Sequence, residues 1–550
     1  MRYFAFILLI ITLAISCKKE DNSPIIGNFQ ADSIFVNNIY MPNGKTINGI
    51  DFENISIRIH FSSKIDTTKF FKCKFTISGG IDTAYNHKFD NSAQTLYISP
   101  YQTLNPLSQY RLLFDQGSNL GGMNTSTYSS AFRTRLDSVP KFPIIPDEDL
   151  LTLLQKQTFK YFWDYAHPIS GLARERFGSG DIVTSGGSGF GVMAILVAIE
   201  RGFITRGEGF ERLNTIINFL KNPETDRFHG VFPHWINGTT GKAYPFSSRD
   251  NGGDLVETAL LFQGLLTVME YFKNGSQPEQ AMCDSIQKLW EEVEWSWYQK
   301  NNENVLYWHW SPNYEWDINL QIRGWNEALI VYVLAASSPT FPISNEVYHN
   351  GWAHNGAYPM VNNKEFYNIQ LPLGFDYGGP LFFAHYSFMG LDPRNLSDQY
   401  ANYWAQNVAH TQINRAHCIA NPKKYQGYSS DCWGLSAGDI QNGYSASSPT
   451  NDLGVISPTA ALSSLPYTPN ESMQALHFFY YTMGDKIWGD CGFKDSFNLT
   501  TLWFADSYLA IDQGPIICMI ENHRTGFLWN TFMSNQDIQN GLETLGFSYQ

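Results

Sequence analysis

The chain has little positive charge. Its 37 Lys and Arg residues stand against 51 Asp and Glu residues, which gives a formal net charge of −14 over 550 residues. A protein that binds nucleic acid needs a basic surface to neutralise phosphates, and this composition does not supply one. We therefore expect no nucleic-acid partner. The charge balance is typical of a protein that handles a neutral substrate.

Motifs for cofactors and metals are also lacking. None of the seven cysteines forms a CxxC pair, and no two of the 13 histidines have the spacing of metal ligands on a helix. The glycine-rich run at 185–191 follows no predicted strand and has no partner lysine, so it is no phosphate loop. We expect no cofactor and no required metal, with a calcium ion held by loop carboxylates as an alternative. Apart from Cys17, we expect the cysteines to be mostly free and buried.

Aromatic residues, in contrast, are abundant. They make up 15% of the chain, with 15 Trp, 30 Tyr and 39 Phe, and hydrophobic residues make up 43%. This excess fits either large cores or rings exposed for stacking against the apolar face of a ligand. A globular chain of this length predicts two domains.

The N-terminus predicts export and lipid attachment. Residues 1–16 carry Arg2, an apolar run and small residues, as a signal peptide does. Cys17 follows directly, which resembles a lipobox whose cysteine becomes the lipid-anchored N-terminus; a plain secretory signal is the alternative. The charged tether at 17–24 resembles the signal that exports Bacteroidetes lipoproteins to the cell surface. We expect an outer-membrane lipoprotein, periplasmic or surface-exposed, that is attached to the membrane only through this anchor.

Residues 25–138 predict a small β-sandwich. Strand-like runs at 55–61, 71–77 and 95–98 alternate apolar and polar residues and are separated by Gly, Asn, Asp and Ser. The segments 108–114 and 132–135 resemble the last strands of bacterial Ig-like domains. No paired carboxylates occur there, so an accessory domain is favoured over a carbohydrate-binding module. A linker with three prolines follows at 139–146.

Residues 147–550 change to a helical pattern. Apolar residues recur three and four apart, and the segments are joined by long loops rich in Gly and aromatic residues. Repeated helical hairpins predict an all-α domain, an α/α toroid, with its site in the loops. The predicted helices cover 189–202, 208–220, 253–273, 280–299, 323–336, 397–413, 470–484 and 500–511.

The acids of these loops are the candidate catalytic groups. Asp250, Asp254 and Glu257 lie beside two glycines and Arg249; a helix that begins near Gly253 would place Asp254 and Glu257 on one face of its first turn. Helix capping is the alternative interpretation, since acids also complement the helix dipole.

Two further segments each offer one acid. Glu327 follows a Trp-rich approach where a loop turns into an apolar helix, and acids among aromatic rings have raised pKa values. Asp512 precedes Gln-Gly-Pro and is expected to end a helix and point into a loop. Candidate ligand-binding residues share these loops: Arg249, His234, Trp235, Trp310, Trp325, Asn326, Tyr377, His385 with Tyr386, Tyr428, Trp433, Tyr444 and Glu521.

Four motifs carry a family resemblance. The run 185–191, the block 249–257, Gly324-Trp325-Asn326-Glu327 and the segment 511–515 together resemble glycoside hydrolase family 144, the glucoamylase-like Bacteroidetes lipoproteins, over residues 147–550. The resemblance implies an (α/α)6 barrel that hydrolyses β-1,2-glucan to sophorooligosaccharides with inversion. It also implies importance for the five acids Asp250, Asp254, Glu257, Glu327 and Asp512.

Inversion requires two carboxyl groups, one on each side of the scissile bond. We assign Glu327 as the general acid and prefer Asp512 over Asp254 and Glu257 as the base. The alternatives are a glucoamylase-like hydrolase of another glucan linkage and a catalytically silent glycan-binding lipoprotein. A monomer is expected.

Overall fold

A computed structural model describes residues 30–68, 75–78, 85–116 and 126–549. The chain divides into two compact units, Met1–Asp137 and Ser138–Gln550. The predicted signal peptide, Cys17 and Cys73 lie outside the described residues. The five described cysteines, Cys283, Cys418, Cys432, Cys491 and Cys518, are free and buried, which confirms that expectation for them.

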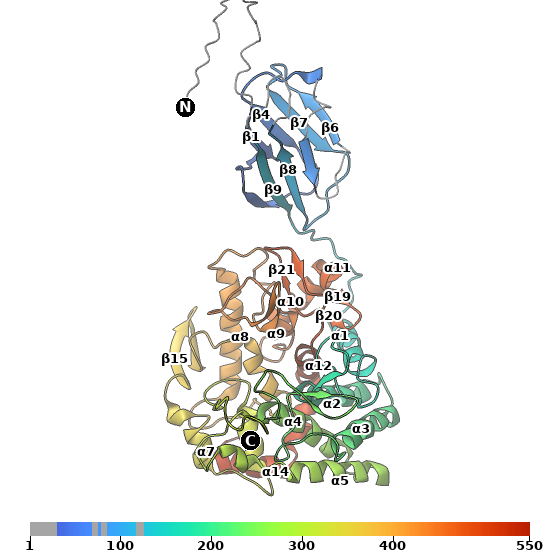
Figure 1. Cartoon of the computed structure of the whole chain (residues 1–550), viewed down its shortest axis with the longest axis vertical. Helices are drawn as coiled ribbons and strands as arrows, with labels where there is room; N and C mark the ends of the chain where they lie inside the picture. Colours follow the sequence, from blue (N-terminus) through green and yellow to red (C-terminus); the bar gives the residue numbers. More distant parts are fainter. Residues whose placement is uncertain (1–29, 69–74, 79–84, 117–125, 550) are drawn as a thin grey trace, which may run out of the picture. The chain divides into compact units, whose positions relative to one another are not determined.

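The first unit consists of two sheets (Figure 1). One has the strand order β2-β1-β4-β7-β6 and the other β3-β9-β8-β5. Alternate residues of β4 and β8 are buried, because successive side chains of a strand point to opposite faces. Buried residues of both sheets form one core cluster. The strands are β1 (Ala31–Val36), β2 (Ile39–Tyr40), β3 (Thr46–Ile50), β4 (Ile57–Phe61), β5 (Phe75–Ser78), β6 (Tyr85–Phe89), β7 (Thr95–Pro100), β8 (Gln109–Phe114) and β9 (Tyr128–Thr134).

The second unit is built mainly of helices, with short sheets in its loops. The helices are α1 (Asp147–Trp163), α2 (Ser185–Glu200), α3 (Arg206–Leu220), α4 (Leu255–Phe272), α5 (Gln277–Glu291), α6 (Leu329–Ser337), α7 (Asn345–Asn350), α8 (Tyr403–Ala420), α9 (Pro458–Leu462), α10 (Pro469–His477), α11 (Gly484–Ile487), α12 (Ala510–Thr525), α13 (Phe527–Met533) and α14 (Gln536–Leu545). Single turns η2 (Trp295–Gln299), η3 (His354–Gly356), η4 (Leu381–Ala384), η5 (Tyr386–Phe388) and η6 (Phe478–Thr482) supplement them.

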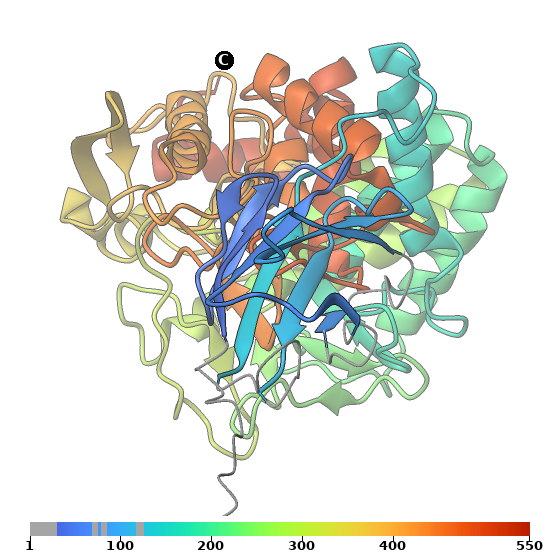
Figure 2. The ribbon, with the colours of Figure 1, turned by 90° about the horizontal axis from the view of Figure 1, so that it is seen from above.

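Helices α2, α4 and α12 form the centre of this unit. Nearly every residue of α2 and α4 is buried, so these helices are apolar on all sides rather than amphipathic. Helix α4 is long and apolar enough to cross a membrane, but most of it is buried, as in the core helix of a globular protein. The chain closes on itself here, because α12 packs against α1 and α2; Figures 1 and 2 show the late helix beside the early ones.

Short ladders in the loops position the polar residues. They are β10 (Ile182–Thr184), β11 (Trp235–Asn237) and β12 (Ala243–Tyr244) in one sheet, and the pairs β13 (Gly253–Asp254) with β14 (His309–Trp310), β15 (Val361–Phe366) with β16 (Ile369–Leu373), β17 (Ala437–Ile440) with β18 (Gly443–Ala446), β19 (Trp488–Gly489) with β20 (Gly492–Phe493), and β21 (Phe497–Asn498) with β22 (Trp503–Phe504). These pairs tie loop segments to one another by backbone hydrogen bonds.

One predicted helix was wrong. Residues 500–511 form β22 and an extended approach, and α12 begins only at Ala510. The Gln-Gly-Pro run was interpreted as the end of a helix, whereas Pro515 lies inside α12, near its start. Pro515 is the sixth residue of α12 and has no N–H to donate to the Ile511 carbonyl, so the helix lacks one backbone hydrogen bond there.

Candidate active site

The site is built first around the N-terminus of α4. Asp254 is the N-cap, and its Oδ1 accepts hydrogen bonds from Val256 N at 3.0 Å and Glu257 N at 2.9 Å. The helix therefore begins where the sequence predicted, and Asp254 performs the capping role that was the alternative. Its second oxygen remains available to the groups around it.

Glu257 is held against the start of α2. Its Oε2 accepts hydrogen bonds from Gly186 N at 2.9 Å and Thr184 Oγ1 at 3.1 Å. A Cβ at Gly186 would lie 2.5 Å from this oxygen, so only glycine allows the approach. Burial raises the pKa of Glu257, and the Asp254 charge adds to this effect, whereas His234 opposes it.

Two histidines balance these acids. His234 Nδ1 lies 3.0 Å from Asp254 Oδ2, and His309 Nε2 lies 3.2 Å from Asp250 Oδ2 and 3.6 Å from Asp254 Oδ2. Burial opposes the charge of His234, but Glu257 and Asp254 raise its pKa to about 9. Burial likewise opposes the charge of His309, and its acidic neighbours raise its pKa overall. His309, on β14 opposite Asp254, was not among the predicted site residues.

The same cluster has the composition of a metal site. Ligand atoms of His234, Asp250 and Asp254 all lie within 4.8 Å of one another. Each of the two acids also faces an imidazole, so these residues form a charge-balanced set of acids and histidines.

Glu327 lies two residues before α6 and is partly exposed. Burial raises the pKa of Glu327 to about 7, and the charges of Glu257 and Asp254 contribute to the shift. The Ser387 hydroxyl donates to the Glu327 carbonyl and also accepts a hydrogen bond from Ile330 N, which fixes the turn into the helix. A carboxyl that remains protonated near neutrality has the property that a general acid needs.

Asp512 lies in the first turn of α12, not at the end of a helix, and is buried. Its carboxyl group lies beside that of Asp495, in the loop between β20 and β21. Burial raises the pKa of Asp512 well above its usual range, and the charges of Asp495 and Asp439 raise it further. Asp439 in turn pairs with Arg176 at 2.9 Å. None of these three partners was predicted, and no motif marks them in the sequence.

Tyr386 connects the two groups of acids. The charges of Asp512, Glu327 and Glu257 all act on its hydroxyl, and with burial they raise the pKa of Tyr386. The hydroxyl is buried and has no hydrogen-bond partner among the residues that the structure describes. Tyr444 is also acted on by Asp512. Acids of all three predicted segments therefore lie close enough for their charges to act on this tyrosine.

Aromatic rings surround the α4 side of the site. Phe246, half-exposed, stacks on the His234 ring at 4.3 Å and lies 4.9 Å from Trp235, which in turn packs against Tyr244. Trp310 contributes a second, partly exposed ring opposite Gly253. These rings confirm that Trp235 and Trp310 lie beside the acids.

Three further predicted residues have peripheral positions. Arg249 is exposed and pairs with Asp317. The Asn326 side chain accepts a hydrogen bond from Ala328 N at 2.9 Å, so it shapes the turn that carries Glu327. Tyr377, with a positive φ of 66°, packs on Phe366 4.3 Å away.

Five predicted ligand-binding residues are packed inside the protein instead. They are Trp325, His385, Tyr428, Trp433 and Glu521, each at most 8% exposed. Glu521 pairs with Arg201 Nε at 2.7 Å and Nη2 at 2.8 Å, and His385 bonds Ser464 while burial lowers its pKa to about 3. We expected these side chains to line the binding site, but each of them is buried among other side chains of the protein.

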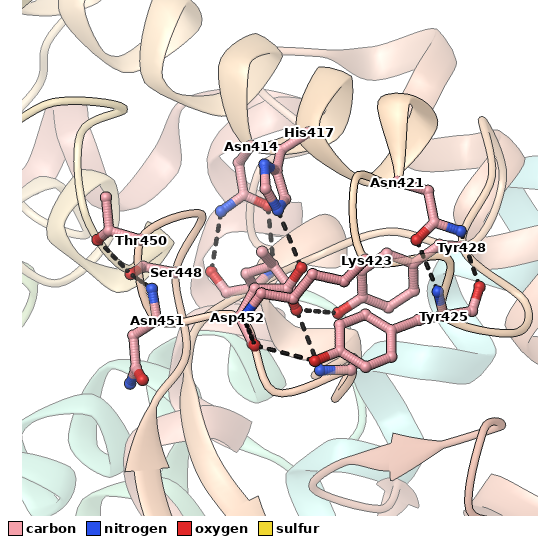
Figure 3. Close-up of polar contacts among 12 residues, drawn as sticks. Asn414, His417, Asn421, Lys423, Tyr425, Tyr428, Ser448, Thr450, Asn451 and Asp452 are labelled. Carbon is pink, nitrogen blue, oxygen red and sulfur yellow. Dashed lines mark hydrogen bonds and ion pairs between the residues drawn. The ribbon is translucent and has the colours of Figure 1, made fainter.

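Tyr428 illustrates the reason (Figure 3). Its hydroxyl donates to Asp452 Oδ1 at 2.8 Å, and His417 Nε2 lies 2.9 Å from Asp452 Oδ2. Lys423 and Tyr425 donate to the Asp452 carbonyl, so one buried acid holds the loop between α8 and α9 together. Buried polar groups need such partners, and Tyr428 serves the loop rather than a ligand.

Known proteins match large parts of this chain. Residues 319–536 match the Glycoamylase family model. An endo-β-1,2-glucanase from Chitinophaga pinensis is 52% identical, over 74% of this chain and 99% of that one, with a TM-score of 0.72. A β-1,2-glucanase from Parabacteroides distasonis is 38% identical, over 94% of this chain and 73% of that one, also with a TM-score of 0.72.

A curated relative widens the comparison. The exo β-1,2-glucooligosaccharide sophorohydrolase of Parabacteroides distasonis is 46% identical over 419 residues, which is 72% of this chain; this chain spans 58% of the length of that relative. The identity to the Chitinophaga enzyme over nearly its whole length exceeds what a shared fold alone requires. The chain therefore belongs to the glucoamylase-like family, glycoside hydrolase family 144.

Proposed function

We propose that the protein hydrolyses β-1,2-glucan to sophorooligosaccharides by an inverting mechanism. The observation that carries the proposal is Glu327: a carboxyl with a pKa of about 7 whose charge, like that of the buried Asp512, acts on Tyr386. Glycoside hydrolysis needs one protonated and one basic carboxyl beside the bond. The similarity to β-1,2-glucanases from Chitinophaga pinensis and Parabacteroides distasonis supports the linkage.

In this mechanism Glu327 gives its proton to the leaving glycosidic oxygen as the bond to the anomeric carbon breaks. A water molecule attacks that carbon from the opposite face and loses its proton to the base, Asp512. Asp250, Asp254 and Glu257, with their histidines, hold the sugar and orient the water. Inversion requires the acid and the base to stand about 6.5–9.5 Å apart in the complex, which leaves room for the water.

Endo cleavage is the favoured mode. The Chitinophaga enzyme, an endo-β-1,2-glucanase, is more similar to this chain than the exo-acting sophorohydrolase is, and this chain spans nearly all of the endo enzyme's length. Exo release of sophorose is the second candidate, because its representative is 46% identical. Product length separates the two: an endo enzyme yields a range of oligosaccharides early, and an exo enzyme yields sophorose alone.

The deciding experiment is incubation with a panel of glucans that differ only in linkage. We expect products from linear β-1,2-glucan and none from α-1,4, β-1,3 or β-1,4 glucans. Cleavage of another linkage alone would favour a glucoamylase-like hydrolase. No cleavage of any glucan, together with tight β-1,2-glucan binding, would favour a silent binding protein. The E327Q variant serves as the control, because it should bind without cleaving.

The architecture and location are part of the proposal. We infer an (α/α)6 toroid for the helical unit and an Ig-like fold for the first unit, in a monomer attached to the outer membrane through Cys17. The two-sheet core of the first unit and the helical pairs of the second support this architecture. Sedimentation tests the monomer, and an experimental structure tests the folds. A C17S variant tests the anchor: it should leave the membrane fraction, and retention there would contradict lipid attachment.

A further inference from the structure

Asp495 and Asp512 form a pair of carboxyl groups away from solvent. Both residues are at most 2% exposed. Asp495 Oδ2 accepts hydrogen bonds from Asp439 N at 2.5 Å and Ser496 Oγ at 3.0 Å, so this oxygen is supplied with donors. Asp495 Oδ1 and Asp512 Oδ2 are buried, and no donor group of the described residues reaches either of them.

The two carboxyl groups nevertheless lie close enough to hydrogen-bond with each other once one of them carries a proton. Two carboxylates have only acceptor oxygens, so a hydrogen bond between them requires a proton on one of them. Two buried charges at this separation would also repel strongly, and such pairs retain one proton between them. One shared proton therefore accounts for both oxygens that lack another donor.

The groups packed around the pair do not remove this requirement. Asp439 approaches from β17, and its charge raises the pKa of Asp512. Arg176, whose charge lowers the pKa of Asp512, is held by Asp439 at 2.9 Å and by Glu175 at 3.0 Å, so part of its charge is already neutralised. The raised pKa values of Tyr386, from η5, and Tyr444, from β18, keep both hydroxyls neutral near Asp512.

We propose that Asp495 is a positioning residue for the base: its carboxyl and that of Asp512 hold one proton between them and act in the reaction as a single group. The proposal rests on the assignment of Asp512 as base in the proposed function. Asp495 lies outside every motif of the sequence and contacts the reacting atoms only through Asp512.

The number of protons on the pair and on Glu327 is restored in each reaction cycle. Before cleavage the pair carries one proton and one negative charge. When the attacking water gives its proton to Asp512, the shared proton passes to Asp495, and both carboxyls become neutral. Glu327 loses one proton to the leaving oxygen in the same step. Release of a proton by the pair and uptake of one by Glu327 restore the starting state.

Infrared spectroscopy tests the shared proton without any activity measurement. The full chain carrying E327Q, which removes the acid with a pKa of about 7, should show the carbonyl stretch of a protonated carboxyl at neutral pH. Adding D495N or D512N should remove this signal, because a single remaining carboxyl next to an amide ionises. S507A, which removes a donor to Asp439 but not to the pair, should retain it. An unchanged signal in both E327Q/D495N and E327Q/D512N would overturn the proposal.

Kinetics test the consequence for catalysis. D495N keeps the size and a hydrogen bond to Asp512 but removes the proton store, so kcat should fall about 100-fold, the usual contribution of acid–base catalysis, with little change in KM. The acid limb of the pH profile should move to higher pH, because a lone buried carboxylate protonates more readily than a pair that stabilises its charge internally. A purely structural role for Asp495 would leave the limb in place. A folded D495N enzyme with wild-type kcat and an unmoved acid limb would overturn the proposal.

The glucan assay tests the proposed function, and the infrared measurement tests the shared proton independently of it. If the wild-type protein cleaves no β-1,2-glucan, the proposed function is wrong, whereas the infrared signal still reports whether the pair shares a proton. If the wild type is active and the signal does not depend on Asp495, the function stands and the shared proton is wrong.

Discussion

At the scale of single residues, surroundings give chemically identical carboxyl groups different charges. Asp254 accepts two backbone N–H bonds and faces two histidines, and its pKa is lowered despite burial. Burial raises the pKa of Glu327 to about 7, and no histidine pairs with it among the described residues. This separation fits Glu327 as the proton donor.

The first prediction concerns the pH dependence of Glu327. The acid must be protonated, so kcat/KM should decline as the pH rises through about 7. E327Q cannot donate a proton, and its kcat should fall about 100- to 10,000-fold while KM changes little. Rates on β-1,2-glucan from pH 4 to about 9, a range that spans the expected acid and base limbs, provide the measurement. An alkaline limb of equal position in E327Q would contradict the assignment.

The second prediction concerns Glu521, which the sequence placed in the site and the structure places in a buried ion pair with Arg201. Removing one partner leaves a buried charge unpaired, so E521A should lower the free energy of unfolding by about 3 kcal/mol. The kcat/KM of the folded fraction should stay within about twofold, because Glu521 lies in the later turns of α12, whereas Asp512 lies in its first turn. Substitutions at distant sites have independent effects. Urea unfolding and assays at low temperature test both parts. A large loss of kcat/KM without loss of stability would restore Glu521 to the site.

Single residues also show what the sequence could predict about the site. Asp254, Glu257 and Glu327 stand at helix starts beside glycine and tryptophan, so local pattern was sufficient to find them. Asp439 lies in β17 and Asp495 in the loop between β20 and β21, and only tertiary pairing brings them to Asp512. Long-range contacts of this kind leave no periodic signal in a single sequence.

At the scale of elements, helices were predicted better than the segments between them. Helices α2, α3 and α4 lie within a few residues of the predicted ranges because their apolar residues recur with helical spacing. The segment 500–511 has a similar composition, yet β22 pairs with β21 and keeps it extended. Pairing with a neighbouring strand overrides local propensity, and such pairing could not be inferred from the segment itself.

The third prediction concerns the hairpin of β11 and β12 and the loop that follows it. The loop places the exposed Phe246 ring over His234, next to the acids, where a sugar ring can stack. Losing one aromatic contact costs about 1 kcal/mol, so F246A should raise KM about fivefold with little change in kcat. Y101A, an exposed aromatic of the first unit, is the control. Equal KM values for F246A and wild type on a long glucan would exclude this ring from the binding surface.

At the scale of the whole molecule, the two units have separate cores. The core cluster of the first unit is formed only by its own residues, from Ala31 to Phe132. All five predicted acids belong to the second unit, as do Asp495, Asp439 and Tyr386. The sequence predicted this division from its hydrophobic pattern. Apolar residues alternate with polar ones before the proline-rich linker and recur with helical spacing after it.

The fourth prediction follows from this division. A chain that begins at Ser138 keeps the whole helical unit, so it should fold alone and hydrolyse soluble β-1,2-glucan with kcat/KM within about twofold of the full chain, because separate domains contribute independently. Chitinophaga pinensis supplies the precedent, since its enzyme aligns over 99% of its length with 74% of this chain. Purification of residues 138–550, a melting curve and the glucan assay test it. If that unit folds with one cooperative transition but loses most of its activity, the first unit must contribute to the substrate site, and its role as a mere accessory domain would be wrong.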